Sequence, residues 1–262
     1  MNLNLENKKA FVCGSTQGIG KAIAIELSVL GAEIILIARN EEKLRQTLSE
    51  LNTAKGQKHA YIPVDFSNTS ILKEKTEQWI KENGTVHILI NNTGGPPAGK
   101  AIDASLEEFV QAFNNHLLCN QVLVQAVEPG MKEAGYGRII NIISTSVKQP
   151  IPGLGVSNTI RAAVANWAKT LSVELAPFGI TVNNVLPGAT ETSRLTSIIE
   201  KRAEKNTQSI EAVKLEMQHE IPARRFGSPS EIAAAAAFLT TPAAGYITGI
   251  NLPVDGGRTA CL

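Results

Sequence analysis

A glycine-rich turn near the N-terminus carries the first residues that could do chemistry. It follows the apolar run 10–13 and precedes a stretch whose apolar residues fall on one helical face. Glycine lets such a turn adopt positive φ and lets a pyrophosphate approach the backbone, while the helix N-terminus offers free amides and positive partial charge. A turn that is glycine-rich for tightness alone fits this strand–helix context less well. The sequence therefore predicts dinucleotide binding by the turn, which consists of Gly14, Ser15, Thr16, Gln17, Gly18, Ile19 and Gly20.

The residues after the second apolar run decide which nicotinamide dinucleotide fits. An acidic side chain about 20 positions beyond the glycines would bind the ribose hydroxyls of NAD(H). Here the positions are Ala38, Arg39 and Asn40, which provide no carboxylate. The Arg39 guanidinium can pair with a 2′-phosphate and lie over the adenine, so NADP(H) is favoured over NAD(H). The alternative is that Arg39 is an ordinary solvated surface charge.

The elements that must position these residues alternate regularly. Short apolar runs of strand-like composition recur with helix-like stretches between them, which predicts right-handed crossovers and a parallel sheet. Several runs are apolar throughout, as expected for strands covered on both faces. The predicted fold class is α/β, a Rossmann-type doubly wound parallel sheet of about seven strands in a three-layer sandwich. The expected strands are 10–13, 34–37, 60–65, 87–90, 138–143, 181–186 and 250–254.

Helix signals complete this outline. An apolar stripe at helical spacing runs through 160–171, and serine–glutamate capping boxes at 105–108 and 228–231 mark two helix starts. The charged stretch 193–225 is predicted to be a mostly helical insertion and is a candidate lid over the substrate. No internal repeat or linker interrupts the chain, so we expect a single domain over residues 1–262.

Composition excludes several classes of function. The 25 Lys and Arg residues against 24 Asp and Glu residues leave a formal charge of +1, which gives no broad field to attract nucleic acid or an anionic membrane. The three cysteines are far apart and have no zinc-binding spacing, so we expect free thiols and no metal site. No stretch approaches the ~20 apolar residues of a membrane span, and the N-terminus is polar. We therefore expect a cytoplasmic protein.

The glycine spacing, Gly-x-x-x-Gly-x-Gly, resembles the turn of the short-chain dehydrogenase/reductase family, and further matches follow in order along nearly the whole chain. Asp65 closes the third expected strand where the family places an Asp near adenine. The segment 91–94, Asn-Asn-Thr-Gly, lies where the family has Asn-Asn-Ala-Gly, and 246–257 looks like the family's C-terminal segment. Besides the turn and Arg39, the resemblance implies these cofactor-binding residues: Asp65, Phe66, Asn92, Thr93, Gly94, Arg161, Pro187, Gly188 and Thr192.

The sequence differs from this family at the catalytic residues. In the family, a Ser beyond the fifth strand polarises the carbonyl, a Tyr thirteen residues later supplies the proton, and a Lys four positions further lowers the Tyr pKa and holds the nicotinamide ribose. Ser144 matches the first, but the next two positions are Ser157 and Arg161, so Tyr-x-x-x-Lys is replaced by Ser-x-x-x-Arg. Serine is too weak an acid to protonate an alkoxide efficiently near neutral pH, and arginine is effectively always protonated. On one helix face, Ser157 and Arg161 could jointly hold the cofactor while Arg161 stabilises developing negative charge.

Other polar residues are candidates for supporting roles. His116 stands where the family has an Asn that supports a proton-relay water, and it titrates in a range useful for a substitute acid. Lys148, in the loop after the fifth strand, is a second candidate acid. A helix-packing histidine and a solvated lysine are the plain alternatives. The loop 94–99 is expected to wall the substrate pocket, and Arg224 and Arg225 are either partners for an anionic substrate group or surface charges.

These observations lead to two hypotheses about function. The first is an NADP(H)-dependent oxidoreductase acting on a carbonyl or alcohol, most similar to the family's 3-oxoacyl-[acyl-carrier-protein] reductases, with a small-molecule carbonyl or acyl-thioester substrate. The second is an NADP(H)-binding module without redox turnover, in which proton delivery has been lost. The resemblance also implies a homodimer or homotetramer, formed through the helices that contain His116 and Arg161.

Overall fold

The computed structural model describes residues 1–261, and at its centre lies one parallel sheet of seven strands. The strand order is β3-β2-β1-β4-β5-β6-β7, so the chain winds outward from β1 in both directions. The central strands are buried on both faces, as expected for a parallel sheet. The strands are β1 (Lys9–Cys13), β2 (Glu33–Ala38), β3 (Ala60–Pro63), β4 (Ile88–Asn91), β5 (Gly137–Ile142), β6 (Ile180–Pro187) and β7 (Asn251–Val254).

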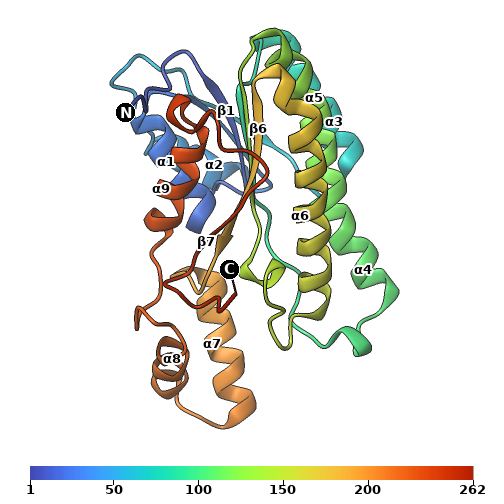
Figure 1. Ribbon diagram of the computed structural model, residues 1–262, viewed down its shortest axis with the longest axis vertical. Helices are drawn as coiled ribbons and strands as arrows, with labels where there is room; N and C mark the ends of the chain where they lie inside the picture. The colour runs from blue at the N-terminus through green and yellow to red at the C-terminus, as the bar shows by residue number, and fades with distance from the viewer. Residues whose placement is uncertain (262) are drawn as a thin grey trace.

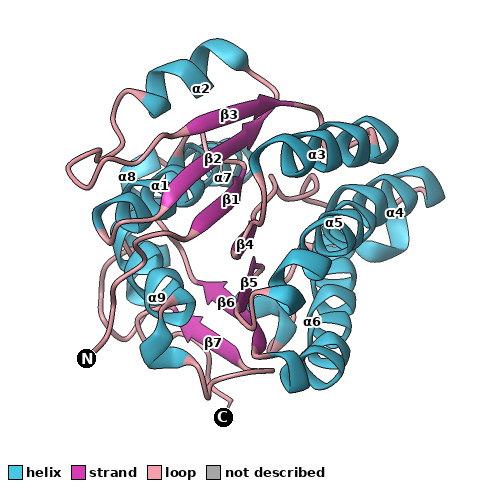
Figure 2. Cartoon of the chain, turned by 90° about the horizontal axis from the view of Figure 1, so that it is seen from above, coloured by secondary structure: helices cyan, strands magenta, loops and turns pink. Residues whose placement is uncertain are grey.

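Helices cover both faces of the sheet and complete a three-layer sandwich (Figure 2). Side chains of α1, α2 and α9 join one apolar core with the sheet, and side chains of α3, α5 and α6 join a second core on the opposite face. A π-helical turn, η2 (Asn114–Leu118), separates α4 from α5. The α-helices are α1 (Gly18–Val29), α2 (Glu41–Leu48), α3 (Thr69–Asn83), α4 (Leu106–Phe113), α5 (Cys119–Glu133), α6 (Gly155–Leu175), α7 (Ser193–Asn206), α8 (Ile210–His219) and α9 (Pro229–Thr240).

The predicted fold class is confirmed, and each of the seven expected strands overlaps an observed one. Both predicted capping boxes are present: Ser105 with Glu108 begins α4, and Ser228 with Glu231 begins α9. The predicted apolar stripe lies in α6, where Val164 is buried. Within the described part of the chain, no helix has the length and apolar character that a membrane crossing requires.

The helices α7 and α8 form a small unit of their own beyond the sheet. Figure 1 shows them projecting below the three layers, and they fill most of the segment predicted as an insertion. Their facing side chains make a separate apolar cluster that does not include any residue of the sheet. The helices α7 and α8 therefore pack against each other without contributing side chains to the two cores of the sheet. The cluster consists of Leu195, Ile199, Ala203, Val213, Met217, Ile221 and Phe226.

A row of asparagine side chains crosses the sheet beneath α6. Asn91 on β4 donates to Asn141 on β5 at 2.8 Å, Asn141 donates to Asn184 on β6 at 2.9 Å, and Asn184 donates to Asn251 on β7 at 2.8 Å. The four residues are directly opposite one another in the strand register. This asparagine ladder gives partners to most of these buried amide groups, although the Asn91 Oδ1 has none among the described residues, and it ends one residue before Asn92.

Candidate functional site

The glycine turn joins β1 to α1 where the strand order reverses between β1 and β4. Gly14 and Gly18 have φ values of +58° and +54°, a region that residues with side chains rarely adopt. A Cβ at Gly14 would stand 2.4 Å from the Asn92 carbonyl oxygen, and a Cβ at Gly20 would stand 2.3 Å from the Gly14 oxygen. The turn therefore presents bare backbone that any larger residue would displace.

Two polar residues from other elements hold this turn. The Asn92 side-chain amide donates to the carbonyl oxygens of Cys13, at 3.2 Å, and Gly14, at 3.3 Å. Thr192 begins α7, and its Cγ2 lies so near Gly18 that an added Cβ there would be 3.2 Å away. Asn92 thus fixes the turn to β4, and Thr192 brings the start of the α7–α8 unit against it.

The first amides of α1 have no side-chain partner. Gln17 is the N-cap residue but makes no capping hydrogen bond. The Ser15 hydroxyl is fully buried and has no hydrogen-bond partner among the described residues. Unsatisfied donors at a helix N-terminus, beside backbone that is free of side chains, are the chemistry that receives a phosphate group.

Arg39, Asp65 and Phe66 lie together at the ends of β2 and β3. The Arg39 guanidinium is 3.7 Å from the Asp65 carboxylate, but three-quarters of the Arg39 side chain (76%) is exposed, so this pair is weak and leaves the arginine available. The backbone amide of Ser67 donates to Asp65 and, with the charge of Arg39, keeps the pKa of that carboxyl below its usual value. Phe66 is partly buried against the second core.

The three other predicted cofactor residues of the loops are Gly94, Pro187 and Gly188. Gly94 is exposed in the loop after β4. Pro187 ends β6, and the Gly188 amide donates to the Val254 carbonyl at 3.0 Å. A Cβ at Gly188 would be 2.7 Å from the Asp255 Cα, so glycine is needed where the two last strands end. Both loops, after β4 and after β6, leave the carboxyl edge of the sheet, as the glycine turn does.

Ser144 and Ser157 stand at the ends of neighbouring elements. Ser144 follows β5 and is half-buried, and its hydroxyl accepts a hydrogen bond of 3.1 Å from the Ser146 amide. Ser157 is half-buried in the first turn of α6, one helical turn before Arg161. The side chain of Asn158 bonds the backbone of Ile151 and so ties α6 to the loop that precedes it.

Arg161 is buried, with 8% of its surface exposed, and its guanidinium is anchored to backbone rather than to a carboxylate. Nη1 donates to the Ile142 carbonyl at 2.9 Å and Nη2 to the Thr93 carbonyl at 3.4 Å, while Nε has no partner among residues 1–261. Burial, with a further effect of the charge on Arg194, lowers the pKa of Arg161 to about 10. The residue still carries its charge at neutral pH, and it places that charge at the carboxyl end of β4 and β5.

His116 lies in the π-helical turn and points toward the same loop. Its Nδ1 is 2.6 Å from the Thr93 hydroxyl, and the side chain is 2% exposed. Burial, together with the charge of Arg161, lowers the pKa of His116 to about 3. The imidazole is therefore neutral at physiological pH. This argues against the expected role of His116 as a general acid, because the protonated form is scarce where the enzyme would work.

Arg194 is a residue of this region that sequence reasoning missed. It lies two positions after Thr192, and its Nη2 donates to the Pro96 carbonyl at 2.8 Å. A Cβ at Gly95 would be 3.7 Å from the Arg161 Nη2 and 4.0 Å from the Arg194 Nη2. The sequence indicated only that Arg194 lies at the start of the predicted insertion. No neighbouring residue predicts its contact with a loop 98 residues earlier.

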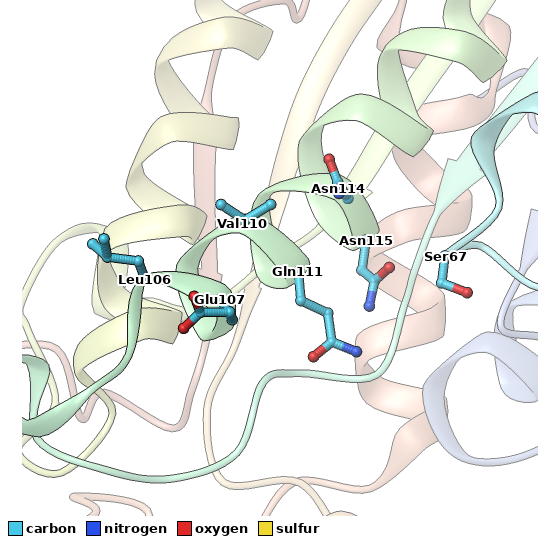
Figure 3. Close-up of a pocket in the computed structure, with 7 residues that line it drawn as sticks. All are labelled: Ser67, Leu106, Glu107, Val110, Gln111, Asn114 and Asn115. Carbon is cyan, nitrogen blue, oxygen red and sulfur yellow. The ribbon is translucent and has the colours of Figure 1, made fainter.

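Two cavities lie outside this region, since neither is lined by Arg161 or Arg194. The larger one, of about 280 Å³, opens between α4 and the loop after β3, and its lining includes Ser67, Gln111 and Asn115 (Figure 3). The smaller one, of about 100 Å³, lies between the loop after Ser144 and the C-terminal segment, and its lining includes Gln149 and Arg258. In the described chain, no group of three or more His, Cys, Asp or Glu residues could hold a metal ion.

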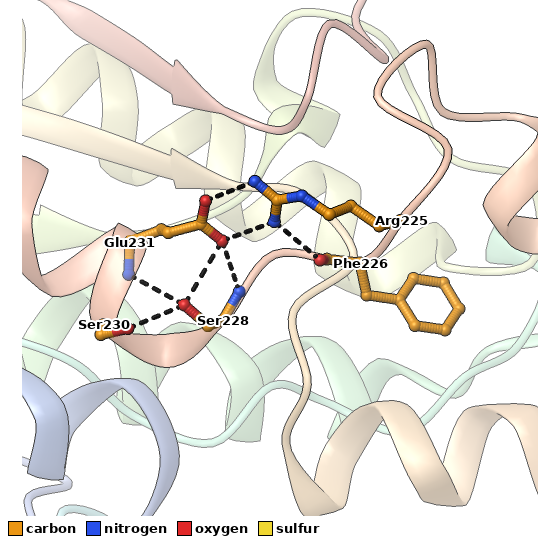
Figure 4. Close-up of polar contacts among 5 residues, drawn as sticks. All are labelled: Arg225, Phe226, Ser228, Ser230 and Glu231. Atoms are coloured by element: carbon orange, nitrogen blue, oxygen red, sulfur yellow. Dashed lines mark hydrogen bonds and ion pairs between the residues drawn. The ribbon is translucent and has the colours of Figure 1, made fainter.

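Arg225, one of the two arginines expected either to meet an anion or to be surface charge, is engaged within the protein. Its guanidinium pairs with both carboxylate oxygens of Glu231, at 2.8 and 2.6 Å, and also donates to the Phe226 carbonyl (Figure 4). Glu231 also closes the capping box at Ser228. The hydrogen bonds from Arg225, followed by those of Ser228, lower the pKa of Glu231 to about 2. Arg225 thus holds the loop after α8 against the start of α9.

Comparison with known proteins fits this geometry. The family model described as enoyl-(acyl carrier protein) reductase matches residues 14–259. The chain is 31% identical over 255 residues to an NADPH-dependent reductase, BacG, of Bacillus subtilis, covering 97% of this chain and 98% of the relative. It is 34% identical over 255 residues to the 3-oxoacyl-[acyl-carrier-protein] reductase FabG of Vibrio cholerae, covering 97% and 98% of the two chains.

Solved structures agree with these relatives. The crystal structure of YwfH, an NADPH-dependent reductase involved in bacilysin biosynthesis, superposes with a TM-score of 0.92 at 30% identity, covering 97% of this chain and 99% of that one. L-Sorbose reductase of Gluconobacter frateurii, complexed with NADPH and L-sorbose, gives a TM-score of 0.93 at 28% identity, with both chains fully covered. The expectation of an oxidoreductase is thereby confirmed, and the chain belongs to the short-chain dehydrogenase/reductase family.

Proposed function

We propose that this protein is an NADP(H)-dependent oxidoreductase that interconverts a carbonyl and an alcohol. The observation that carries the proposal is the glycine turn: bare backbone at Gly14 and Gly20, held by Asn92, before a helix whose first amides lack a side-chain cap. Two relatives that share the fold along nearly their whole length are described as NADPH-dependent or are complexed with NADPH. Substrates to be tested first are 3-oxoacyl thioesters and small ketones.

The described residues fit NADP(H) along the carboxyl edge of the sheet. The glycine turn would receive the pyrophosphate, and Arg39 would pair with the 2′-phosphate, since no acidic side chain follows β2 to repel it. Asp65 and Phe66 would border the adenine, next to the larger cavity. The nicotinamide end of the cofactor would lie near Thr93, Gly94, Arg161, Pro187, Gly188 and Thr192. The phosphates would lie near the remaining residues of the glycine turn, which are Ser15, Thr16, Gln17, Gly18 and Ile19.

The chemistry is proposed to rest on electrostatics rather than on a strong side-chain acid. When bound, the nicotinamide supplies a hydride to the carbonyl carbon. Arg161, held by the Ile142 and Thr93 carbonyls, keeps a fixed positive charge near the oxygen that becomes negative. The hydroxyls of Ser144 and Ser157 orient the carbonyl and a water that delivers the proton. His116, neutral and bonded to Thr93, positions the loop that carries this backbone carbonyl.

We propose that the α7–α8 unit is the substrate lid. It has its own apolar cluster, begins at Thr192 against the glycine turn, and reaches the loop after β4 through Arg194. A unit with a separate core can move as a body while the sheet stays intact.

The test is direct. Titration with NADPH and NADH, followed by quenching of protein fluorescence, should give tighter binding of NADPH. Consumption of NADPH is then followed at 340 nm with a panel of 3-oxoacyl thioesters and ketones. Binding with turnover of at least one substrate supports the proposal, and the absence of NADPH binding refutes it.

A second candidate function, an NADP(H)-binding module without turnover, is favoured by the positions of the tyrosines. Tyr61 donates to Glu41, Tyr136 donates to the Thr240 carbonyl, and Tyr246 is fully exposed, so none of these hydroxyls is near Ser157. The double variant Ser157→Tyr with Arg161→Lys distinguishes the two functions. If the protein is a binding module, the double variant should oxidise NADPH with a substrate that the original protein does not reduce. If the protein is an enzyme, the original protein should already consume NADPH with that substrate.

We also propose a homodimer or homotetramer. Apolar side chains are exposed on the helices expected at the interface, among them Val110 on α4 and Val173 on α6, at 60% and 68% exposure. Sedimentation equilibrium measures the mass, and a monomer at micromolar concentration contradicts this part of the proposal.

A further inference from the structure

Two arginines from distant parts of the chain meet at the loop after β4. Arg161 approaches from α6 and Arg194 from α7, and the Nη2 atoms of both lie within 4.0 Å of the position that a Cβ at Gly95 would occupy. Arg194 is held there by the Pro96 carbonyl at 2.8 Å, and Arg161 by the Thr93 carbonyl. A Cβ at Gly95 would therefore be in van der Waals contact with both guanidinium groups, and glycine leaves that position free of a side chain.

These two charges are not compensated within the protein. Among the ion pairs of the described residues, none involves Arg161 or the exposed Arg194. Arg138 and Arg224 also have no carboxylate partner but bond backbone carbonyls elsewhere. The arginines with carboxylate partners are Arg39, Arg45, Arg202, Arg225 and Arg258. Arg161 is also buried and keeps an unpartnered Nε. A buried charge without a counter-charge is strongly destabilising, and two neighbouring cations repel each other. An anion bound between them would remove both penalties.

We propose that Arg194 and Arg161 form a carboxylate-binding site across Gly95, and that the natural substrate is an oxo acid whose carboxylate is bound there. This inference rests on the proposed reductase function and narrows its substrate class. A carboxylate beside Gly95 could accept charge-assisted hydrogen bonds of ~2.8 Å from both guanidinium groups, because both Nη2 atoms lie within 4.0 Å of one position there. Arg194 is the specificity-determining residue, because Arg161 has its Nη1 and Nη2 donors engaged by the backbone.

The geometry favours a substrate group over a phosphate of the cofactor. The glycine turn and Arg39 already provide separate partners for the cofactor's phosphates, at the ends of β1 and β2. Arg194 instead bonds the loop of Gly95 and Pro96, which follows β4 and borders the start of α6, where Gly99 exchanges backbone hydrogen bonds with Gly153 and Gly155. This is the side on which Ser157 lies.

The experiment compares acids with their neutral counterparts. A panel of 2-oxo and 3-oxo acids of different chain lengths is assayed for NADPH consumption, each acid beside its methyl ester, in the original protein and in Arg194→Gln. We expect the best acid to exceed its ester in kcat/KM, and Arg194→Gln to lower kcat/KM for the acid by about 10- to 100-fold while the ester changes by less than about twofold. The matched control is Lys201→Gln, which removes another cation from the same helix and should leave both unchanged because Lys201 is exposed and has no ion-pair partner among the described residues.

Binding measurements separate this inference from the proposed function. Calorimetric titration with the same acids, and with their amides, is made with and without NADPH. Tighter binding of an acid than of its amide, lost in Arg194→Gln, supports the carboxylate site even if no substrate turns over. The inference is overturned if no acid binds or reacts better than its neutral counterpart. It is equally overturned if Arg194→Gln weakens NADPH binding and lowers acid and ester turnover by the same factor, which would assign Arg194 to the cofactor.

Discussion

Replacing His116 by asparagine should flatten the dependence of protein stability on pH. The pKa of His116 is lowered to about 3 in the folded protein because the imidazole is buried and faces Arg161, whereas an unfolded histidine titrates near 6.5. Between these values the unfolded state binds a proton that the folded state does not. Stability from this group is therefore fully present above pH 6.5 and is lost as the pH falls toward 3. From pH 7.5 to pH 5.0 the linkage amounts to about 2 kcal/mol.

The assay is urea unfolding followed by circular dichroism at several pH values between 7.5 and 5.0. His116→Asn should keep a polar partner for Thr93 and lose about 2 kcal/mol less than the original protein over this range. Carboxyl groups titrate equally in both proteins, so the difference between the two curves isolates the histidine. Parallel curves would show that His116 is not held neutral by burial and by Arg161, and would restore it as a candidate acid.

Three further predictions concern the cofactor turn, Arg39 and the sheet. Gly20→Ala should weaken NADPH binding by more than about tenfold, because its Cβ would fall 2.3 Å from the Gly14 oxygen. Gly227→Ala, where a Cβ would meet nothing nearer than 3.8 Å, is the control, and both are measured by fluorescence titration. Arg39→Asp should lower the affinity for NADPH and raise that for NADH, since the new carboxylate repels a 2′-phosphate and suits a free ribose; unchanged selectivity in the same titration would contradict the role of Arg39. Asn141→Leu should destabilise the fold by about 2–4 kcal/mol in urea unfolding, because it leaves the amides of Asn91 and Asn184 buried without this partner; a loss below about 0.5 kcal/mol would mean that the ladder contributes little.

Much of the fold could be predicted from the sequence because its signals are local. Continuous apolar runs such as 34–37 mark strands buried on both faces, and β2 includes all four residues. The glycine spacing before α1 predicts a turn of bare backbone, and the positive φ of Gly14 and Gly18 agrees with it. Capping boxes at Ser105 and Ser228 depend only on neighbours within three residues, so these helix starts were also predictable.

The contacts that define the candidate site are not local, and this is why the sequence did not reveal them. The approach of Arg194 to Arg161 depends on how α7 leaves β6, and the bond from Arg194 to the Pro96 carbonyl joins residues 98 positions apart. The π-helical turn that directs His116 at Thr93 could not be predicted, because no residue pattern in the sequence distinguishes it from an α-helix. The low pKa of His116 follows from burial beside a cation, which only the packed structure contains.

The asparagine ladder has a consequence for how the chain reaches this structure. In a strand, successive side chains face opposite sides of the sheet, so a slip of one residue between β5 and β6 would turn Asn184 away from Asn141 and bring Val185 or Asn183 opposite it. Val185 offers no side-chain hydrogen bond, and Asn183 would have to leave its bonds with the Ile247 carbonyl and the Ile250 amide. Each buried polar group that loses its partner costs about 1–3 kcal/mol. The ladder therefore discriminates against misaligned pairing of β5 with β6 during folding. Correct alignment of β4 in turn delivers Asn92 to the glycine turn and the Thr93 carbonyl to Arg161.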